Sequence, residues 1–297
     1  MTLSWRSRAL PVVLRLTRRR AYRSAQSACD HIDQRAQHPQ PYWPPPGLRK
    51  DVSLGFTLRS GWPIYTVTST TSDAPRCTVV YLHGGAWVNE IAPQHWQLAA
   101  HIAGDAHARV IVPIYPLVPF TTAAAVVPTI AELVAEETGP DHSVCLAGDS
   151  AGGQMALSVA LMLRDEQHLV LPQTVLISPV LDASLTNPLI DAVRDPWLTR
   201  AGLLEFAKRW CGDLPMTDPL VSPLGADLSG LGPLTVFSGT RDILNPDARL
   251  LVEKATAAGV AIDYHEQPGL VHVYPLTPTP EGRAARTLIV ERLRSEA

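Results

Sequence analysis

The sequence lacks the features that mark disulfide-rich, metal-binding and nucleic-acid-binding proteins. Its 297 residues include only four cysteines, scattered and without a Cys-x-x-Cys pair, and no cluster has the spacing of zinc ligands. Charged residues make up 18% and the formal net charge is −3, so charge gives no argument for nucleic acid as a partner. A hydrophobic content of 46% argues against intrinsic disorder. We therefore expect a globular protein with reduced core cysteines that acts on a small molecule.

A long apolar run is also missing from the start of the chain. Residues 1–25 carry seven arginines, but their longest apolar run, 9–14, is too short for a signal peptide and contains Pro11. The sequence thus indicates neither secretion nor a membrane span, and we expect a cytoplasmic protein. We expect this basic segment to form a helix over the functional site with its arginines in solvent. The alternative is a weak contact with an anionic membrane surface. The oligomeric state is left open.

What the sequence does contain is an alternation of strand-like and helix-like stretches without internal repeats. Apolar runs predict strands at 52–58, 62–68, 77–82, 109–113, 143–147, 174–178, 234–238 and 261–265. Helices are predicted near 93–104, 122–137, 152–164, 246–258 and 281–296. The first two strands form a hairpin, and the others indicate a mostly parallel, doubly wound α/β sheet with helices on both faces.

The domain organisation follows from two departures from this alternation. Residues 1–50 precede the first strand and end in a proline-rich linker at 39–46, and we assign them to an N-terminal cap segment. Residues 51–297 form the main domain. The stretch 180–231 is far longer than an ordinary connection between strands, so we interpret it as a helical cap insertion.

The motif that carries chemistry is a Gly-x-Ser-x-Gly pentapeptide centred on Ser150. An apolar run of strand length precedes it, and a stretch rich in helix formers follows it. Glycines on both sides of a serine permit a sharp turn between strand and helix, which exposes the serine hydroxyl as a nucleophile. The strand and helix around it weaken the alternative of an ordinary loop.

A second glycine-rich motif, His83-Gly-Gly-Ala-Trp87, follows the strand that ends at Leu82. Its backbone amides are placed to stabilise the oxyanion that forms when a serine attacks a carbonyl group. Read alone, the motif is equally compatible with a turn that serves topology only. The serine motif downstream favours the catalytic interpretation.

Together the two motifs resemble the hormone-sensitive-lipase-like carboxylesterase branch of the α/β-hydrolase superfamily. The resemblance extends from about residue 77 to the C-terminus, through Tyr115-Pro-Leu-Val-Pro119 and Asp218-Pro-Leu-Val-Ser-Pro223. It implies an α/β-hydrolase fold and an oxyanion hole formed by amides near Gly84, Gly85 and Ala86 together with Ala151. Ala86 stands where the family has a third glycine. Which of Gly84, Gly85 and Ala86 donate hydrogen bonds to the oxyanion is therefore left open.

A serine nucleophile needs a base and an acid that orients the base, and in this superfamily they follow the serine in the order acid, then histidine. His265 lies in a strand pattern, whereas His272 follows it and matches the family's histidine. Asp242 follows a buried strand within Ser238-Gly-Thr-Arg-Asp-Ile-Leu244 and matches the family's acid.

Three other aspartates are weaker candidates for the acid. Asp247 fits the first turn of a helix, Asp263 lies within a strand, and Asp149 beside the nucleophile is interpreted as structural. The predicted catalytic residues are therefore Ser150, Asp242 and His272. Trp87, Tyr42 and Trp43 are candidates for lining the pocket, although core packing would explain any one of them equally well.

The predicted function is hydrolysis of carboxylic esters with short to medium acyl chains through an acyl-enzyme, without metal or organic cofactor. An amidase, formamidase or N-acetyl hydrolase acting on a small metabolite would use the same residues and is the first alternative. A non-catalytic ligand-binding receptor on the same fold is the second. The presence of all three catalytic residues in order argues against it.

Overall fold

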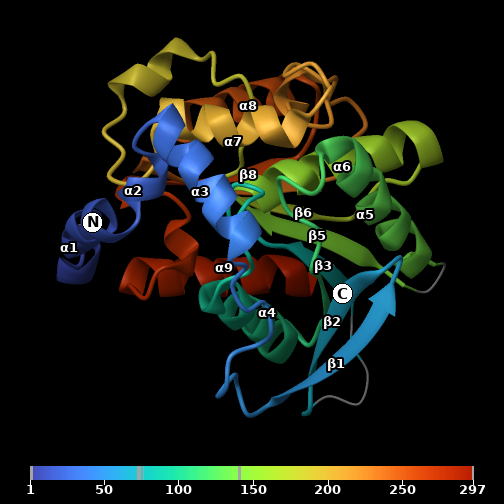
Figure 1. Cartoon of the computed structure of the whole chain (residues 1–297). Coiled ribbons are helices and arrows are strands. Elements are labelled where there is room, and N and C mark those ends of the chain that lie inside the picture. Colours follow the sequence, from blue (N-terminus) through green and yellow to red (C-terminus); the bar gives the residue numbers. More distant parts are fainter. Residues whose placement is uncertain (1–2, 72–74, 76, 140–141, 296–297) are drawn as a thin grey trace.

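The computed structural model describes residues 3–71, 75, 77–139 and 142–295, and its centre is one eight-stranded sheet (Figure 1). The strand order is β1-β2-β4-β3-β5-β6-β7-β8. The pairs β1/β2 and β2/β4 are antiparallel, and all later pairs are parallel. The strands are β1 Val52–Arg59, β2 Trp62–Ser69, β3 Thr78–Leu82, β4 Arg109–Pro113, β5 Val144–Asp149, β6 Thr174–Ile177, β7 Leu234–Arg241 and β8 Ile262–Val271.

Helices cover both faces of the sheet, as the continuous apolar strands require. They include α4 Pro93–Ala106, α5 Ala123–Glu137, α6 Ala151–Gln167, α8 Asn245–Ala257 and α9 Pro280–Ser295. Alternate residues of β3 serve different faces: Val79 and Tyr81 pack with α4 and α9, whereas Val80 and Leu82 pack with α5, α6 and α8. This two-sided core confirms the predicted fold class.

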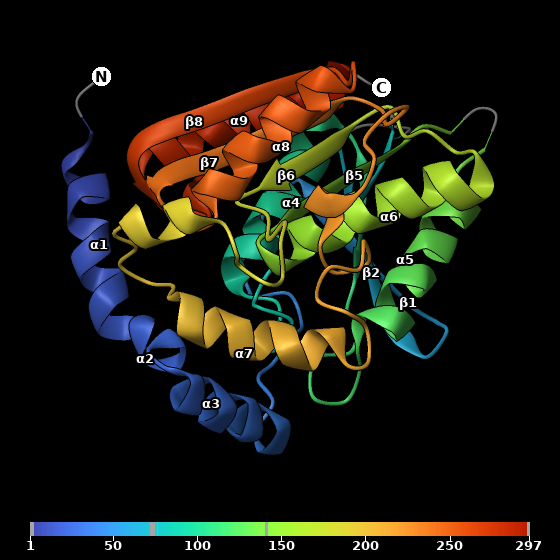
Figure 2. The same cartoon turned by 90° about the horizontal axis from the view of Figure 1, so that it is seen from above.

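A third group of helices lies over the carboxyl ends of the strands. It combines α1 Trp5–Thr17, α2 Arg19–Tyr22 and α3 Ala25–Gln37 with α7 Arg200–Cys211 from the long insertion, and Figure 2 shows them side by side. The insertion also contains the short helices η1 Pro188–Ala192 and η2 Pro223–Gly225, and η3 Tyr274–Leu276 precedes α9. The N-terminal helices and the insertion, which are far apart in the sequence, therefore form one layer over the carboxyl ends of the strands.

One glutamine joins this layer to the core. The side-chain oxygen of Gln154 in α6 accepts hydrogen bonds from the indoles of Trp87, at 3.1 Å, and Trp210 in α7, at 3.0 Å. The two indole rings are stacked with centroids 5.6 Å apart. Its amide nitrogen donates to Ser158 and to the carbonyl of Leu220. Three of these hydrogen bonds are buried and the one to Leu220 is partly buried, so Gln154 ties α7 to the core through Trp210 in a site largely shielded from water.

The structure differs from the predicted elements at β8. The sequence predicts a strand that ends at His265, but β8 continues to Val271. Pro268 and Gly269 disfavour strand structure locally, which hides the continuation. Pairing with β7 restores it through a register shift between Gly239 and Arg241. The strand therefore delivers its end directly to residue 272.

None of the helices in the described ranges is long and apolar enough to cross a membrane.

The crossing of α6 over the strands is set by two glycines. A Cβ on Gly152 would collide with the carbonyl oxygen of Leu82, and one on Gly148 would collide with that of Gly152. Both clashes involve backbone atoms, which cannot rotate away. Only glycine therefore allows α6 to begin this close to β3 and β5.

We expect Gly152→Ala to lower the free energy of unfolding by about 1–3 kcal/mol or more, because the added methyl must push α6 off the sheet. The matched control is Gly225→Ala, where the nearest atom to the added Cβ lies 3.9 Å away, the carbonyl oxygen of Thr217. Urea unfolding followed by circular dichroism measures both. Equal stability of the two variants would contradict the proposed crossing constraint.

Candidate active site

Ser150 occupies the sharp turn between β5 and α6. Its backbone has φ 53° and ψ −117°, a conformation that is strained for a residue with a side chain. The strain is held by hydrogen bonds on both sides: the Ser150 amide donates to Ile177 at 2.8 Å, and its carbonyl accepts from Gln154 and Val180. These bonds fix the side chain above the carboxyl ends of the central strands.

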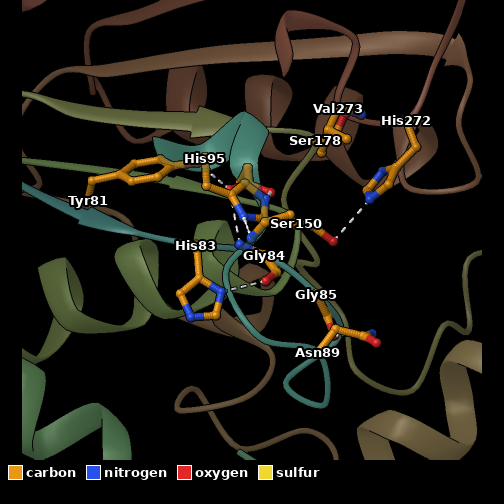
Figure 3. Close-up of polar contacts among 12 residues, drawn as sticks. Tyr81, His83, Gly84, Gly85, Asn89, His95, Ser150, Ser178, His272 and Val273 are labelled. Atoms are coloured by element: carbon orange, nitrogen blue, oxygen red, sulfur yellow. Dashed lines mark hydrogen bonds and ion pairs between the residues drawn. The ribbon is translucent and has the colours of Figure 1, made fainter. Parts of the chain in front are cut away.

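The structure brings Ser150, His272 and Asp242 into one hydrogen-bonded chain. The Oγ of Ser150 lies 3.0 Å from Nε2 of His272, and Nδ1 of His272 lies 2.8 Å from Oδ2 of Asp242. Figure 3 shows Ser150 and His272 pointing toward each other from different segments. Asp242 accepts only, so Nδ1 carries the proton and Nε2 is free to accept one from the serine.

Burial and neighbouring charges shift the pKa of His272 in opposite directions. Its burial alone would lower its pKa, but the carboxylates of Asp242, Asp195 and Asp149 outweigh burial and raise the pKa above the ordinary 6.5. The edge of the Trp197 ring also packs on the imidazole, with centroids 5.4 Å apart. The imidazolium form is therefore well stabilised at this position.

The alternative acid and base candidates lie in other interactions. His265 contacts Asp263 and stacks on Phe237, and Asp263 also pairs with Arg292. Asp247 accepts from the side chain of Asn187. None of these interactions includes Ser150, so the geometry favours Asp242 and His272.

The loop after β3 has an unusual backbone that faces the serine turn. Gly85 has φ +122°, and Ala86 and Trp87 have φ 54° and 59°. The carbonyl of Gly85 accepts from the amides of Val88 and Asn89 and from the Asn89 side chain. A Cβ on Gly85 would lie 2.6 Å from the Asn89 carbonyl oxygen, so this position requires glycine.

The amide of Gly84 has a separate partner. It donates to Oδ1 of Asp149 at 3.0 Å, and the same oxygen accepts from the Tyr81 hydroxyl at 2.6 Å. The sequence leaves open which of Gly84, Gly85 and Ala86 donate to the oxyanion, and this bond separates the first from the other two. Ala151, the first residue of α6, has an amide that belongs to the unpaired N-terminal turn.

Asp149 organises the buried side of the site, as its interpretation as structural implies. Burial alone would raise its pKa, but His95 and the Tyr81 hydroxyl outweigh burial and lower it. His95 lies 3.4 Å from its second oxygen. His83 stacks on Tyr115, and burial and the nearby His95 lower the pKa of His83 to about 3, so it stays neutral.

A cavity of about 1170 Å³ opens at Ser150 and His272. The N-terminal helices contribute Leu10, Val13 and Leu14 to its lining, and the proline-rich segment contributes Trp43. Trp197 of the insertion also lines it, whereas Trp87 and Tyr42 do not. Within the described ranges, no group of three or more His, Cys, Asp and Glu side chains is arranged to hold a metal ion.

The structure adds one residue that sequence reasoning misses. Asp195, in the insertion, accepts from the amides of Trp197 and Leu198 and, at 3.0 Å, from the amide of Ile243, which is next to Asp242. One carboxylate thus holds both the acid loop and the tryptophan that packs on His272. In the sequence, Asp195 is followed by Pro196, and this pair predicts only a turn. The link to Ile243 spans 48 positions and leaves no local pattern.

Comparison with known proteins places the chain in a class. The family model for the alpha/beta hydrolase fold matches residues 79–276. A triacylglycerol lipase of Mycobacterium tuberculosis (strain ATCC 25618 / H37Rv) is 32% identical over 80% of this chain, which spans 51% of that lipase. An acetyl-hydrolase of Streptomyces hygroscopicus is 32% identical over 70% of this chain and 72% of its own length. The chain belongs to the α/β-hydrolase family.

The structural neighbours narrow this further. The crystal structure of an esterase from the bacterial hormone-sensitive lipase family is 28% identical, with a TM-score of 0.81, and the match covers 100% of this chain and 99% of that chain. A putative esterase from Staphylococcus aureus is 27% identical, with a TM-score of 0.81 over 91% of this chain and 94% of that chain. This protein is an enzyme of the hormone-sensitive-lipase-like carboxylesterase branch.

We expect Asp195→Asn to lower kcat/KM at pH 8 about tenfold or more, because an amide nitrogen would then face the Ile243 amide and leave it unpaired. Loss of the negative charge also lowers the apparent pKa of His272, to which Asp195 contributes upward. The pH profile of p-nitrophenyl butyrate hydrolysis measures both effects.

The matched control is Asp191→Asn, in the same insertion, where the aspartate is largely exposed and pairs with Arg200. We expect an unchanged profile there. If Asp195→Asn lowers the rate but leaves the apparent pKa of His272 unchanged, Asp195 stabilises the fold and does not act on His272.

Proposed function

We propose that this protein hydrolyses carboxylic esters of short to medium acyl chains through a covalent acyl-enzyme formed on Ser150. The observation that carries the proposal is the hydrogen-bonded chain from Ser150 through His272 to Asp242. Its members come from three separate loops at the carboxyl ends of β5, β7 and β8, and no local structural requirement brings them together.

In the proposed first step, Nε2 of His272 takes the hydroxyl proton while Ser150 Oγ attacks the ester carbonyl carbon. The imidazolium that forms is stabilised by Asp242, whose carboxylate also fixes the proton on Nδ1. The tetrahedral intermediate then collapses, His272 gives its proton to the leaving alkoxide, and the alcohol departs. Water repeats the sequence on the acyl-enzyme and releases the acid.

We infer that the oxyanion accepts hydrogen bonds from the amides of Gly85, Ala86 and Ala151. The Gly84 amide is already bonded to Asp149, so its contribution is to hold the loop in place. The helix dipole of α6 adds a partial positive charge at Ala151. Each donor aimed at the developing charge contributes about 3–4 kcal/mol to the lowering of the barrier.

The extent of the cavity supports the acyl-chain range. Apolar residues Leu10, Val13 and Leu14 offer a surface for an alkyl chain in this cavity of about 1170 Å³. The similarity to an acetyl-hydrolase supports an acetyl group as one acyl group. Hydrolysis of an N-acetyl amide is the second candidate function, because the same residues would carry it out. Matched p-nitrophenyl acetate and p-nitroacetanilide distinguish the two, because an esterase turns over the first far faster.

We expect Ser150→Ala to lower kcat by roughly 10⁴–10⁶-fold, because no other group can form the acyl-enzyme. The assay compares wild type and variant on p-nitrophenyl acetate, butyrate, octanoate and palmitate, with circular dichroism as the folding control. A fluorophosphonate probe should label wild type only. Hydrolysis by Ser150→Ala at the wild-type rate would refute the mechanism, and preference for palmitate would refute the chain-length range.

We expect kcat/KM to fall as the pH decreases, with a midpoint above 6.5, because the raised pKa of His272 leaves more of it protonated and unable to act as a base. Asp242→Asn should move that midpoint downward and lower kcat by about 10⁴-fold, because the amide favours the wrong tautomer. A stopped-assay pH series from 5 to 9 measures both. A flat profile across this range would exclude His272 as the base.

A further inference from the structure

The helix α1 exposes an apolar stripe to solvent. Trp5, Ala9, Val12 and Leu16 are spaced i, i+4, i+7 and i+11, which places them along one face of a helix. Trp5 is 69% exposed, Val12 62% and Leu16 79%. The buried residues of the same helix are Ser7 and Pro11, on the other side. The helix thus buries a serine and leaves its largest apolar side chains uncovered, which marks an interaction surface.

Arginines border this stripe on both sides. With 100° per residue, Arg8 and Arg15 lie along one edge and Arg6 along the other, and all three are exposed. The Arg6 guanidinium lies 5.6 Å from the Trp5 ring centroid. Four more arginines follow by residue 23, while the first acidic residue is Asp30. The first 29 residues therefore carry seven positive charges in a chain whose net charge is −3.

Among the described residues, these charges have no carboxylate within ion-pair distance. In the part of the chain that the structure describes, the ion pairs involve other basic residues, and none includes the seven arginines before Asp30. The side chain of Arg19 donates a hydrogen bond to the backbone carbonyl of Asp195. The positive charge is thus available to an external partner.

A groove rich in arginine continues this surface onto the insertion. Its volume is about 810 Å³, and Val12 and Leu16 of the stripe form one wall. Its lining has five arginines against two aspartates, with apolar residues beside them, and Arg200 is paired with Asp191. The arginines are Arg15, Arg19, Arg194, Arg200 and Arg241, the aspartates are Asp191 and Asp195, and the apolar residues include Ile190, Val193 and Leu198. Such a mixture suits an anionic headgroup attached to an apolar chain.

We propose that α1 is an interfacial helix that binds the surface of an anionic phospholipid membrane. The exposed tryptophan, valine and leucine enter the boundary between headgroups and acyl chains, and the flanking arginines contact the phosphates. A second protein copy would bring seven arginines against seven arginines, so charge favours lipid over self-association. Because the whole chain has a net charge of −3, the positive charge is concentrated at the N-terminal segment and is not a property of the whole protein surface.

The same helix borders the active-site cavity. Val13 lies beside the stripe, is 50% exposed and lines the cavity together with Leu10 and Leu14. Figure 2 shows α1 at the edge of the molecule, next to α2 and the start of the insertion. A membrane bound to α1 therefore lies next to the cavity mouth. From this position we infer that the substrates are esters dissolved in the membrane, because they can enter the cavity directly from it. This inference rests on the proposed esterase function.

Co-sedimentation with vesicles tests the proposal without reference to activity. We expect wild type to bind phosphatidylcholine vesicles that contain 30% phosphatidylglycerol, and to bind pure phosphatidylcholine far more weakly. Leu16→Asp should lower the partition coefficient at least about tenfold, through lost apolar burial. Replacement of Arg6, Arg8 and Arg15 by glutamine should lower it about fivefold per charge, and only on anionic vesicles.

The matched control is Leu58→Asp on the exposed strand β1, where the leucine is 66% exposed and remote from any arginine cluster in sequence. We expect wild-type partition from it. Circular dichroism melting confirms that each variant is folded. Brominated lipids should quench the fluorescence of wild type, and Trp5→Phe should remove most of that quenching.

Two results would overturn the proposal. One is failure of folded wild type to bind anionic vesicles, and the other is equal binding by wild type and Leu16→Asp. A monomer–dimer equilibrium that Leu16→Asp abolishes, without vesicle binding, would instead identify a second copy as the occupant. Hydrolysis of water-soluble p-nitrophenyl acetate should be unchanged in Leu16→Asp, so loss of membrane binding and failure of the esterase function give different results.

Discussion

The close approach of α6 to the central strands is the constraint on which the active site depends. Gly148 and Gly152 allow the helix to begin almost in contact with β3 and β5. The chain can then reverse only through a strained residue, and that residue is Ser150. The strain fixes the serine in the direction of His272, while the first free amide of the helix lies at Ala151. One packing contact therefore sets the position of both the proposed nucleophile and one of the proposed oxyanion donors.

Asp149 extends this constraint to the rest of the site. Asp149 precedes Ser150 in the chain, and its carboxylate accepts hydrogen bonds from the Gly84 amide, in the loop after β3, and from the Tyr81 hydroxyl, in β3. The loop with the positive φ angles is thereby tied to the serine turn by a buried charge. Asp195 plays the corresponding part for the acid loop, from the insertion. Two carboxylates outside the proposed catalytic chain thus position its neighbours.

Much of the fold could be predicted because its signals are local. Apolar runs and the helix formers between them mark the sheet, and the fold class and family resemblance are confirmed. The end of β8 could not be predicted, because Pro268 and Gly269 oppose strand structure and the pairing with β7 overrides them. The partner of the Gly84 amide was also out of reach. It depends on an aspartate 65 positions away, and only the folded chain decides which of several equivalent amides it takes.

The single glutamine that joins α7 to the core has a consequence for how the enzyme exchanges substrate and product. Swinging α7 outward would break the buried hydrogen bond from the Trp210 indole to Gln154 and separate the stacked rings of Trp87 and Trp210. Since Trp87 belongs to the loop that carries Gly85 and Ala86, such a swing would also disturb that loop. These contacts therefore oppose an outward swing of α7, which contributes no residue to the lining of the cavity at Ser150 and His272. The helix α1 and the proline-rich segment line the cavity instead, and we infer that substrate and product pass along this side without a movement of α7.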